Sequence, residues 1–136
     1  MLRRDYIQRM IEEFGKMLGH VMGLKSINQE QLALEELRKG YKTYFGMDAD
    51  MLAKLSADEF LPFITENASL KPQQLEALAQ ALKLEGDLLS DSVLPVAEEY
   101  HRKALLLFLH LEKTDSGTFS LPRKNAIQEL KEKLGL

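Results

Sequence analysis

Glu98 and His101 are the residues of this chain whose types and spacing come nearest to a chemical motif. Carboxylate-bridged di-iron helix bundles use Glu-x-x-His, but they need two such motifs and further inward-facing glutamates. This chain has one such motif. Glu98 also lies four residues before Arg102, and Glu99 four before Lys103, which predicts ion pairs on a solvated helix. We therefore predict no metal site and no cofactor, and a metal-dependent helical enzyme is a remote alternative.

The histidines are not spaced to converge on one ligand. His101 and His110 are nine residues apart, which places them about 180° apart around a helix. His20 lies among apolar residues, and we expect it to be a hydrogen-bonded core histidine.

The sequence has no motif of a nucleophilic or nucleotide-binding enzyme. Gly-x-Ser-x-Gly, Walker-type, Gly-x-Gly-x-x-Gly and His-Glu-x-x-His patterns do not occur in it. Ser56, Ser69 and Ser120 stand where helix caps are expected, so capping accounts for them. Because the chain has no cysteine, it has no disulfide framework, thiolate zinc site or cysteine nucleophile. We predict that the protein has no catalytic residue and is not an enzyme.

Three glycines, Gly15, Gly19 and Gly23, recur every four residues and therefore share one helix face. A glycine inside a helix costs about 0.5–1 kcal/mol relative to alanine, so a packing reason is expected. One interpretation is close contact with another helix of the same chain. The other is a homodimer contact or a groove on this face.

The charge and hydropathy of the sequence indicate which classes of binding partner to expect. Lys and Arg number 18 against 21 Asp and Glu in 136 residues, and the two signs are evenly spread, which weighs against nucleic-acid binding. The longest apolar run covers 105–109, far short of the roughly 20 residues of a membrane span. The first residues have no apolar stretch typical of a signal peptide. We expect a cytoplasmic protein with no nucleic-acid or membrane partner.

Leucine dominates the composition, with 26 residues against 12 for Val, Ile and Thr together. Leucine favours helices, and branched residues favour strands. We predict one all-α domain over 1–136 with about six helices in antiparallel hairpins. Gly23, Gly46 and Gly86 are expected to end helices, and Asn28 to cap one. The expected helices cover 5–22, 28–45, a short segment from 56 that Pro62 kinks or delays, 72–86, 96–113 and 122–134.

Apolar and small residues in the second half follow the pattern of a helical hairpin. Leu75, Leu78-Ala79, Leu82 and Gly86-Asp87 resemble the first helix and turn of a tetratricopeptide repeat (TPR), and Ala97, His101 and Ala104-Leu105 resemble its second helix. About six additional residues separate the two parts. A weaker copy lies upstream in Met17, His20-Val21, Leu24, Asn28, Ala33, Leu37 and Gly40. Such hairpins stack into an α–α superhelix with a concave surface.

The opening residues of the chain resemble the N-terminal segment of a protein family. Asp5-Tyr6-Ile7-x-Arg9-x-Ile11-Glu12 resembles the N-terminus of an uncharacterised bacterial family of small TPR-like helical proteins. The resemblance implies a bacterial helical protein and implies no activity.

Two functional hypotheses remain beside the remote enzyme. The first is a non-catalytic TPR-like protein–protein interaction module that binds a protein or peptide and could form a homodimer. The alternative is a small-molecule-sensing or regulatory protein with a pocket between helices.

Overall fold

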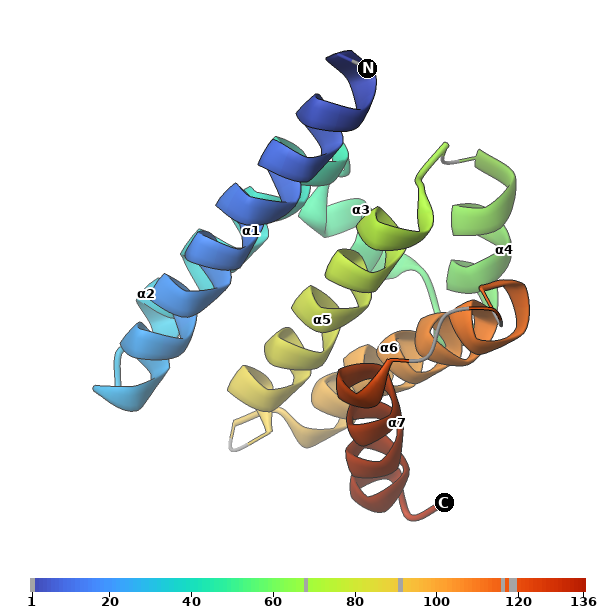
Figure 1. Ribbon diagram of the computed structural model, residues 1–136. Coiled ribbons are helices and arrows are strands. Elements are labelled where there is room, and N and C mark those ends of the chain that lie inside the picture. Colours follow the sequence, from blue (N-terminus) through green and yellow to red (C-terminus); the bar gives the residue numbers. More distant parts are fainter. Residues whose placement is uncertain (1, 68, 91, 116, 118–119) are drawn as a thin grey trace. The chain divides into compact units, whose positions relative to one another are not determined.

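A computed structural model of the protein describes residues 2–67, 69–90, 92–115, 117 and 120–136. These residues form seven α-helices and no strand, so the all-α class is confirmed (Figure 1). The chain divides into two compact units, Met1–Lys54 and Leu55–Leu136, and each is described by itself. A single domain over 1–136 stays a prediction.

The first unit contains α1 (Leu2–Ser26), α2 (Glu30–Phe45) and the short α3 (Ala49–Lys54). Helix α3 is an addition to the six helices that we expected. Helices α1 and α2 form a hairpin, in which the Phe14 ring makes T-shaped contacts with the rings of Tyr44 and Phe45 at centroid distances of 5.6 and 5.3 Å. The other buried residues of this hairpin include Met10, Val21, Ala33, Leu37 and Tyr41.

Gly40 is the glycine at which α1 and α2 approach closely. It is buried, and a Cβ built on it would lie 2.7 Å from the Cε atom of Met17. The missing side chain therefore makes room for Met17. Gly40 is the last residue of the weaker copy of the hairpin pattern in the sequence.

The helix ends of this unit differ from our expectation at Gly23 and Asn28. Helix α1 continues through Gly23 to Ser26, and Asn28 has a left-handed φ of 62° instead of capping α2. Helix α2 starts at Glu30 after Gln29, which makes no side-chain capping bond. Gly46 does end α2 as predicted, with a φ of 67°; its N–H is donated to the Lys42 carbonyl and that of Met47 to the Tyr41 carbonyl. A glycine ends a helix only where the chain turns left-handed.

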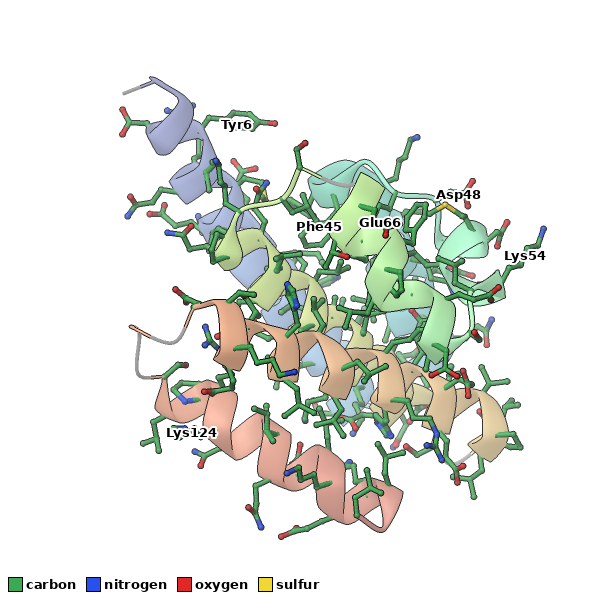
Figure 2. The ribbon with its side chains drawn as sticks, turned by 90° about the vertical axis from the view of Figure 1, so that its right-hand side faces the viewer. Tyr6, Phe45, Asp48, Lys54, Glu66 and Lys124 are labelled. Carbon is green, nitrogen blue, oxygen red and sulfur yellow. The ribbon has the colours of Figure 1, made fainter. Side chains whose placement is uncertain are left out.

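The second unit contains α4 (Ala57–Asn67), α5 (Pro72–Leu89), α6 (Leu94–Thr114) and α7 (Leu121–Leu134). Helix α6 is the centre of this unit and packs against α5, α4 and α7. In Figure 2 it faces the viewer between α4 and α7. Ala79 of α5 and Ala97 and Ala104 of α6 are fully buried, which lets these two helices approach closely.

Helix α5 does not end at Gly86 as predicted but continues to Leu89. The expected connection over 86–95 is therefore shortened to 90–93. Gly86 and Asp87 lie inside α5 and do not form its turn. The residues that separated the two parts of the repeat pattern are mostly helical.

Capping is confirmed at two of the three predicted serines. The Ser56 hydroxyl accepts the N–H of Glu59, whose carboxylate accepts the N–H of Ser56. The Ser120 hydroxyl accepts the N–H of Arg123. Before α5, however, Lys71 takes the capping position in place of Ser69, and its N–H is donated to the Gln74 side chain. Pro62 lies inside α4, which begins at Ala57 despite it.

Candidate functional site

Gly86 of α5 lies directly against the His101 ring of α6. The His101 side chain is buried, and a Cβ built on Gly86 would overlap its ring at Cδ2 and Nε2. The histidine ring therefore occupies the space that any other residue at position 86 would fill. Gly86 therefore serves the packing of α5 against α6 and does not form the turn that the sequence pattern predicted.

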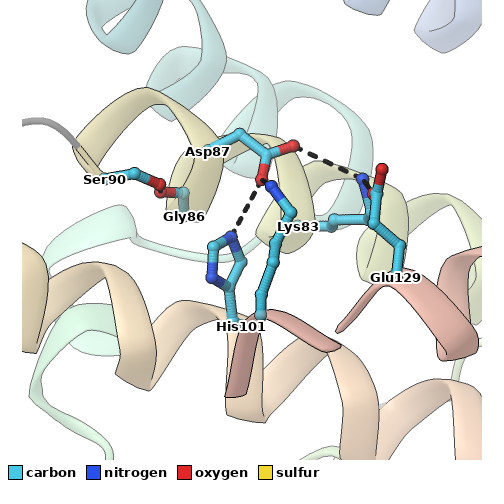
Figure 3. A network of polar contacts seen from close by, with 7 residues as sticks. Lys83, Gly86, Asp87, Ser90, His101 and Glu129 are labelled. Atoms are coloured by element: carbon cyan, nitrogen blue, oxygen red, sulfur yellow. Dashed lines mark hydrogen bonds and ion pairs between the residues drawn. The ribbon is translucent and has the colours of Figure 1, made fainter. Parts of the chain in front are cut away.

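Asp87, one residue further along α5, receives hydrogen bonds from three helices (Figure 3). His101 Nε2 lies 2.9 Å from Oδ1, and the Lys133 Nζ atom of α7 lies 2.9 Å from the same oxygen. Lys83 Nζ lies 3.4 Å from Oδ2 and also pairs with Glu129 of α7. Because a carboxylate only accepts, Nε2 of His101 carries the proton.

The groups around Asp87 lower the pKa of its carboxyl. Burial would raise the pKa of this carboxyl, but the hydrogen bonds from His101 and Lys133 and the charge of Lys83 outweigh it and hold the pKa far below its ordinary value. Burial also lowers the pKa of Lys83, yet Glu129 and Asp87 raise it by more. The cluster is therefore charged and internally paired, and it holds α5, α6 and α7 together.

Ser90 does not extend the Asp87–His101 pair into a nucleophilic triad. Its hydroxyl donates to the Gly86 carbonyl at 2.8 Å, one turn earlier on the same helix. A triad needs the hydroxyl within reach of the imidazole. The geometry of this pair fits a structural role.

Lys103 is another buried charge in the core of this unit. Its side chain is 1 % exposed, and Nζ lies 4.8 Å from the centre of the Tyr100 ring. Burial lowers the pKa of Lys103, while the carboxylates of Glu99 and Glu85 oppose that shift. Lys103 therefore lies in the interior and not on the solvated helix face that we expected, while Glu99 is half-buried. Glu99 also accepts the N–H of Ala57 and so joins α6 to the start of α4.

Arg123 fixes α7 in a similar way. Its Nε donates to both carboxylate oxygens of Glu76 at 3.2 and 3.0 Å, and one Nη lies 3.2 Å from Asp115. The guanidinium thus connects α7 to α5 and to the residue that follows α6. Paired hydrogen bonds of this kind are among the stronger polar contacts.

The outward face of α6 carries charged groups that are not paired in this way. A hollow of about 540 Å³ lies between the first turn of α4 and the first turns of α6. Within the described ranges, Asp58, Glu98 and Arg102 make no hydrogen bond or ion pair at this hollow, so the expected Glu98–Arg102 ion pair is not formed. The hollow is lined by Ser56, Ala57, Asp58, Pro95, Glu98, Glu99 and Arg102.

Large apolar side chains adjoin this hollow at the start of α6. Val93, Leu94 and Val96 are exposed, and Leu94 is 57 % accessible. Pro95 belongs both to this apolar segment and to the lining of the hollow. An exposed apolar cluster with a polar margin is typical of a surface that contacts another molecule.

The glycine stripe of α1 is on an exposed face. Gly15, Gly19 and Gly23 are exposed, and apart from adjacent residues and the backbone of α1 itself, no atom of the described residues lies within 4 Å of a Cβ built on any of them. Their role as a helix-packing or dimer face stays a prediction. His20, which we expected in the core, is exposed on the same helix.

The histidine and glutamate residues of the metal hypothesis face different surroundings. Glu98 lines the hollow, whereas His101 is bonded to Asp87. Among the residues that the structure describes, no group of three or more His, Cys, Asp or Glu side chains comes together in a geometry that could hold a metal ion.

Comparison with protein-family models, curated proteins and solved structures found no match for this chain. The family resemblance of the opening residues is therefore not confirmed. None of the described helices is both long enough and apolar enough to cross a bilayer.

Proposed function

We propose that this protein is a non-catalytic helical interaction module and that the start of α6 is its contact surface. The observation that supports this function is the exposed apolar segment Val93–Val96 beside a hollow whose charged side chains include three that bond to no described residue. Apolar side chains that remain in water lose the free energy that burial would give, about 25 cal/mol per Å². A partner that covers them recovers this energy.

The arrangement of the other polar groups also supports a binding role. Asp87 and Arg123 of the second unit are used for connections between helices. The charged groups of the hollow lie instead at the surface of α4 and α6, where a partner can reach them. We also propose that the α1–α2 and α5–α6 hairpins are TPR-like and that the protein is bacterial and cytoplasmic.

Site-specific photo-crosslinking tests the interaction surface. A photoreactive residue at Val93 is expected to give discrete protein adducts in an extract of the source cells, and the same residue at the exposed Lys131 of α7 serves as the control. The adducts should disappear when Leu94→Asp is added, because a charge in the apolar segment opposes burial. Circular dichroism should show that each variant keeps its helices.

The proposed function is wrong if Val93 gives no more adduct than Lys131, or if Leu94→Asp leaves the adducts unchanged. An adduct made only with a second copy of the chain would limit the interaction to self-association.

A further inference from the structure

The outward side of α6 carries four residues spaced every four positions, which form one ridge: Leu94, Glu98, Arg102 and Leu106. Leu94 and Arg102 are exposed, and Glu98 and Leu106 are half-buried. At 1.5 Å per residue the ridge is about 18 Å long. Figure 2 shows its helix facing outward between α4 and α7.

The two charges of this ridge do not pair with each other, although their spacing would allow it. Glu98 precedes Arg102 by four residues, an orientation that favours an ion pair within a helix. No such pair forms, and neither side chain bonds to another residue in the described part of the chain. Asp58 and Glu99 add further negative charge to the hollow beside Glu98. The lining thus has three acidic side chains and one basic side chain, Arg102, so its net charge is negative and complements an incoming cation.

The order of residues along the ridge is the same in both directions except for the sign of charge. Read either way, it begins and ends with leucine and has one acidic and one basic residue between them. Two antiparallel copies would place Leu94 against Leu106 of the partner subunit and Glu98 against Arg102 of the partner subunit. A two-fold axis repeats each contact, as an isologous interface requires. Ridges of i, i+4 residues pack together in the commonest class of helix contact.

We propose that this ridge is a homodimer interface in which two α6 helices cross antiparallel. Arg102 of the partner subunit then enters the hollow formed by Asp58, Glu98 and Glu99. The proposal rests on the proposed function, since it names a second copy of this chain as the partner at that surface. The surface area buried between two helices of this length is smaller than the roughly 1,200 Å² of a stable interface, so the dimer is weak and concentration-dependent.

Charge reversal and sedimentation measure this dimer directly. Purified protein is studied by analytical ultracentrifugation from ~1 µM to ~1 mM, the range in which weak association is measured. Glu98→Arg or Arg102→Glu alone should weaken dimerisation at least about tenfold, because like charges then face each other. An equimolar mixture of the two variants should regain dimers, because each supplies the charge that the other lacks.

Two control variants distinguish this ridge from other surfaces of the chain. Lys113→Glu makes the same change of charge on α6, beyond the ridge, and should leave dimerisation unchanged. Gly19→Glu tests the alternative face on α1 and should also leave it unchanged. A protein that is monomeric throughout the range, or a dimer that neither reversal weakens, overturns the proposal. Val93 adducts with a different protein would then leave the proposed function standing.

Disulfide crosslinking tests the antiparallel register. The chain has no cysteine, so Leu94→Cys and Leu106→Cys are each unique. A mixture of the two variants should form a disulfide-linked dimer, while either variant alone should not, because its own sulfurs would lie about 18 Å apart. Crosslinking of each variant with itself would show a parallel dimer and overturn the antiparallel arrangement.

Discussion

Asp87 is a residue at which polar contacts from three helices of the second unit meet. His101, Lys83 and Lys133 surround it, so its negative charge is stabilised in the folded protein. In the unfolded chain these groups are dispersed and the carboxyl regains an ordinary pKa. Asp87 therefore links the stability of the unit to pH.

The sign of this linkage follows from the lowered pKa. Below pH ~4, where an ordinary aspartate gains its proton, the unfolded state binds more protons than the folded state. The stabilisation from Asp87 is thus complete above that pH and is lost as the pH falls from there toward the folded pKa. Asp87→Asn should cost about 1–3 kcal/mol at pH 7, because it weakens hydrogen bonds to charged groups.

Urea unfolding of the wild type and Asp87→Asn at several pH values checks this prediction. The difference in unfolding free energy should shrink steadily between pH ~5 and pH ~2. Glu66→Gln, which changes an exposed carboxylate of α4, should show no such trend. A difference that is the same at every pH would contradict the role of the Asp87 charge.

Gly86 and Gly15 both lie inside helices but have different surroundings. In α5, Gly86 lies against the buried His101 ring, whereas Gly15 of α1 has open space around it. Both glycines lie inside a helix, so alanine has a similar advantage in helix propensity over glycine at each position. A difference in stability between the two substitutions therefore comes from packing. The two glycines therefore form a matched pair for a test.

Gly86→Ala should destabilise the protein by about 1–3 kcal/mol, because the added methyl group forces the ring and its bond to Asp87 to move. Gly15→Ala should stabilise the protein by about 0.5–1 kcal/mol, because alanine favours the helix and meets no neighbour. Chemical unfolding followed by circular dichroism measures both changes.

A double variant isolates the clash between the added methyl group and the ring. With His101→Ala in the same chain, the methyl group no longer meets a ring, so the two substitutions together should cost less than the sum of each alone. Additive costs would show that the contact between α5 and α6 is not the cause.

Helix content could be predicted from the sequence, but several helix ends could not. The spacing of Leu75, Leu78 and Leu82 places a buried face on α5, and two of these residues are fully buried. Gly23 and Gly86 were expected to end helices because glycine favours that position. Both continue the helix because the chain does not turn left-handed there, and that turn depends on the contacts of the following residues.

The two units differ in how much core each contains. The first has one hairpin with the short α3, and the second has α4, α5 and α7 packed around α6. Small segments bury less of their surface on folding and are less stable. We expect a fragment of residues 55–136 to unfold cooperatively and a fragment of residues 1–54 to be only partly helical.

Circular dichroism and thermal unfolding of the two fragments check this expectation. The intact chain is the reference, and its transition should be at least as sharp as that of the 55–136 fragment. A fragment 1–54 that unfolds cooperatively, or a fragment 55–136 that does not, would contradict it.

The amino-acid sequence is sufficient for the helical class of this protein, because helical spacing and leucine content are local properties. It also predicts the caps at Ser56 and Ser120, which involve residues only three positions apart. Local patterns cannot show that His101 is buried against Gly86, that Lys103 lies in the interior, or that Glu98 and Arg102 do not pair with each other. Those outcomes depend on neighbours from other helices, and packing in three dimensions determines which charges are satisfied within the chain and which face outward.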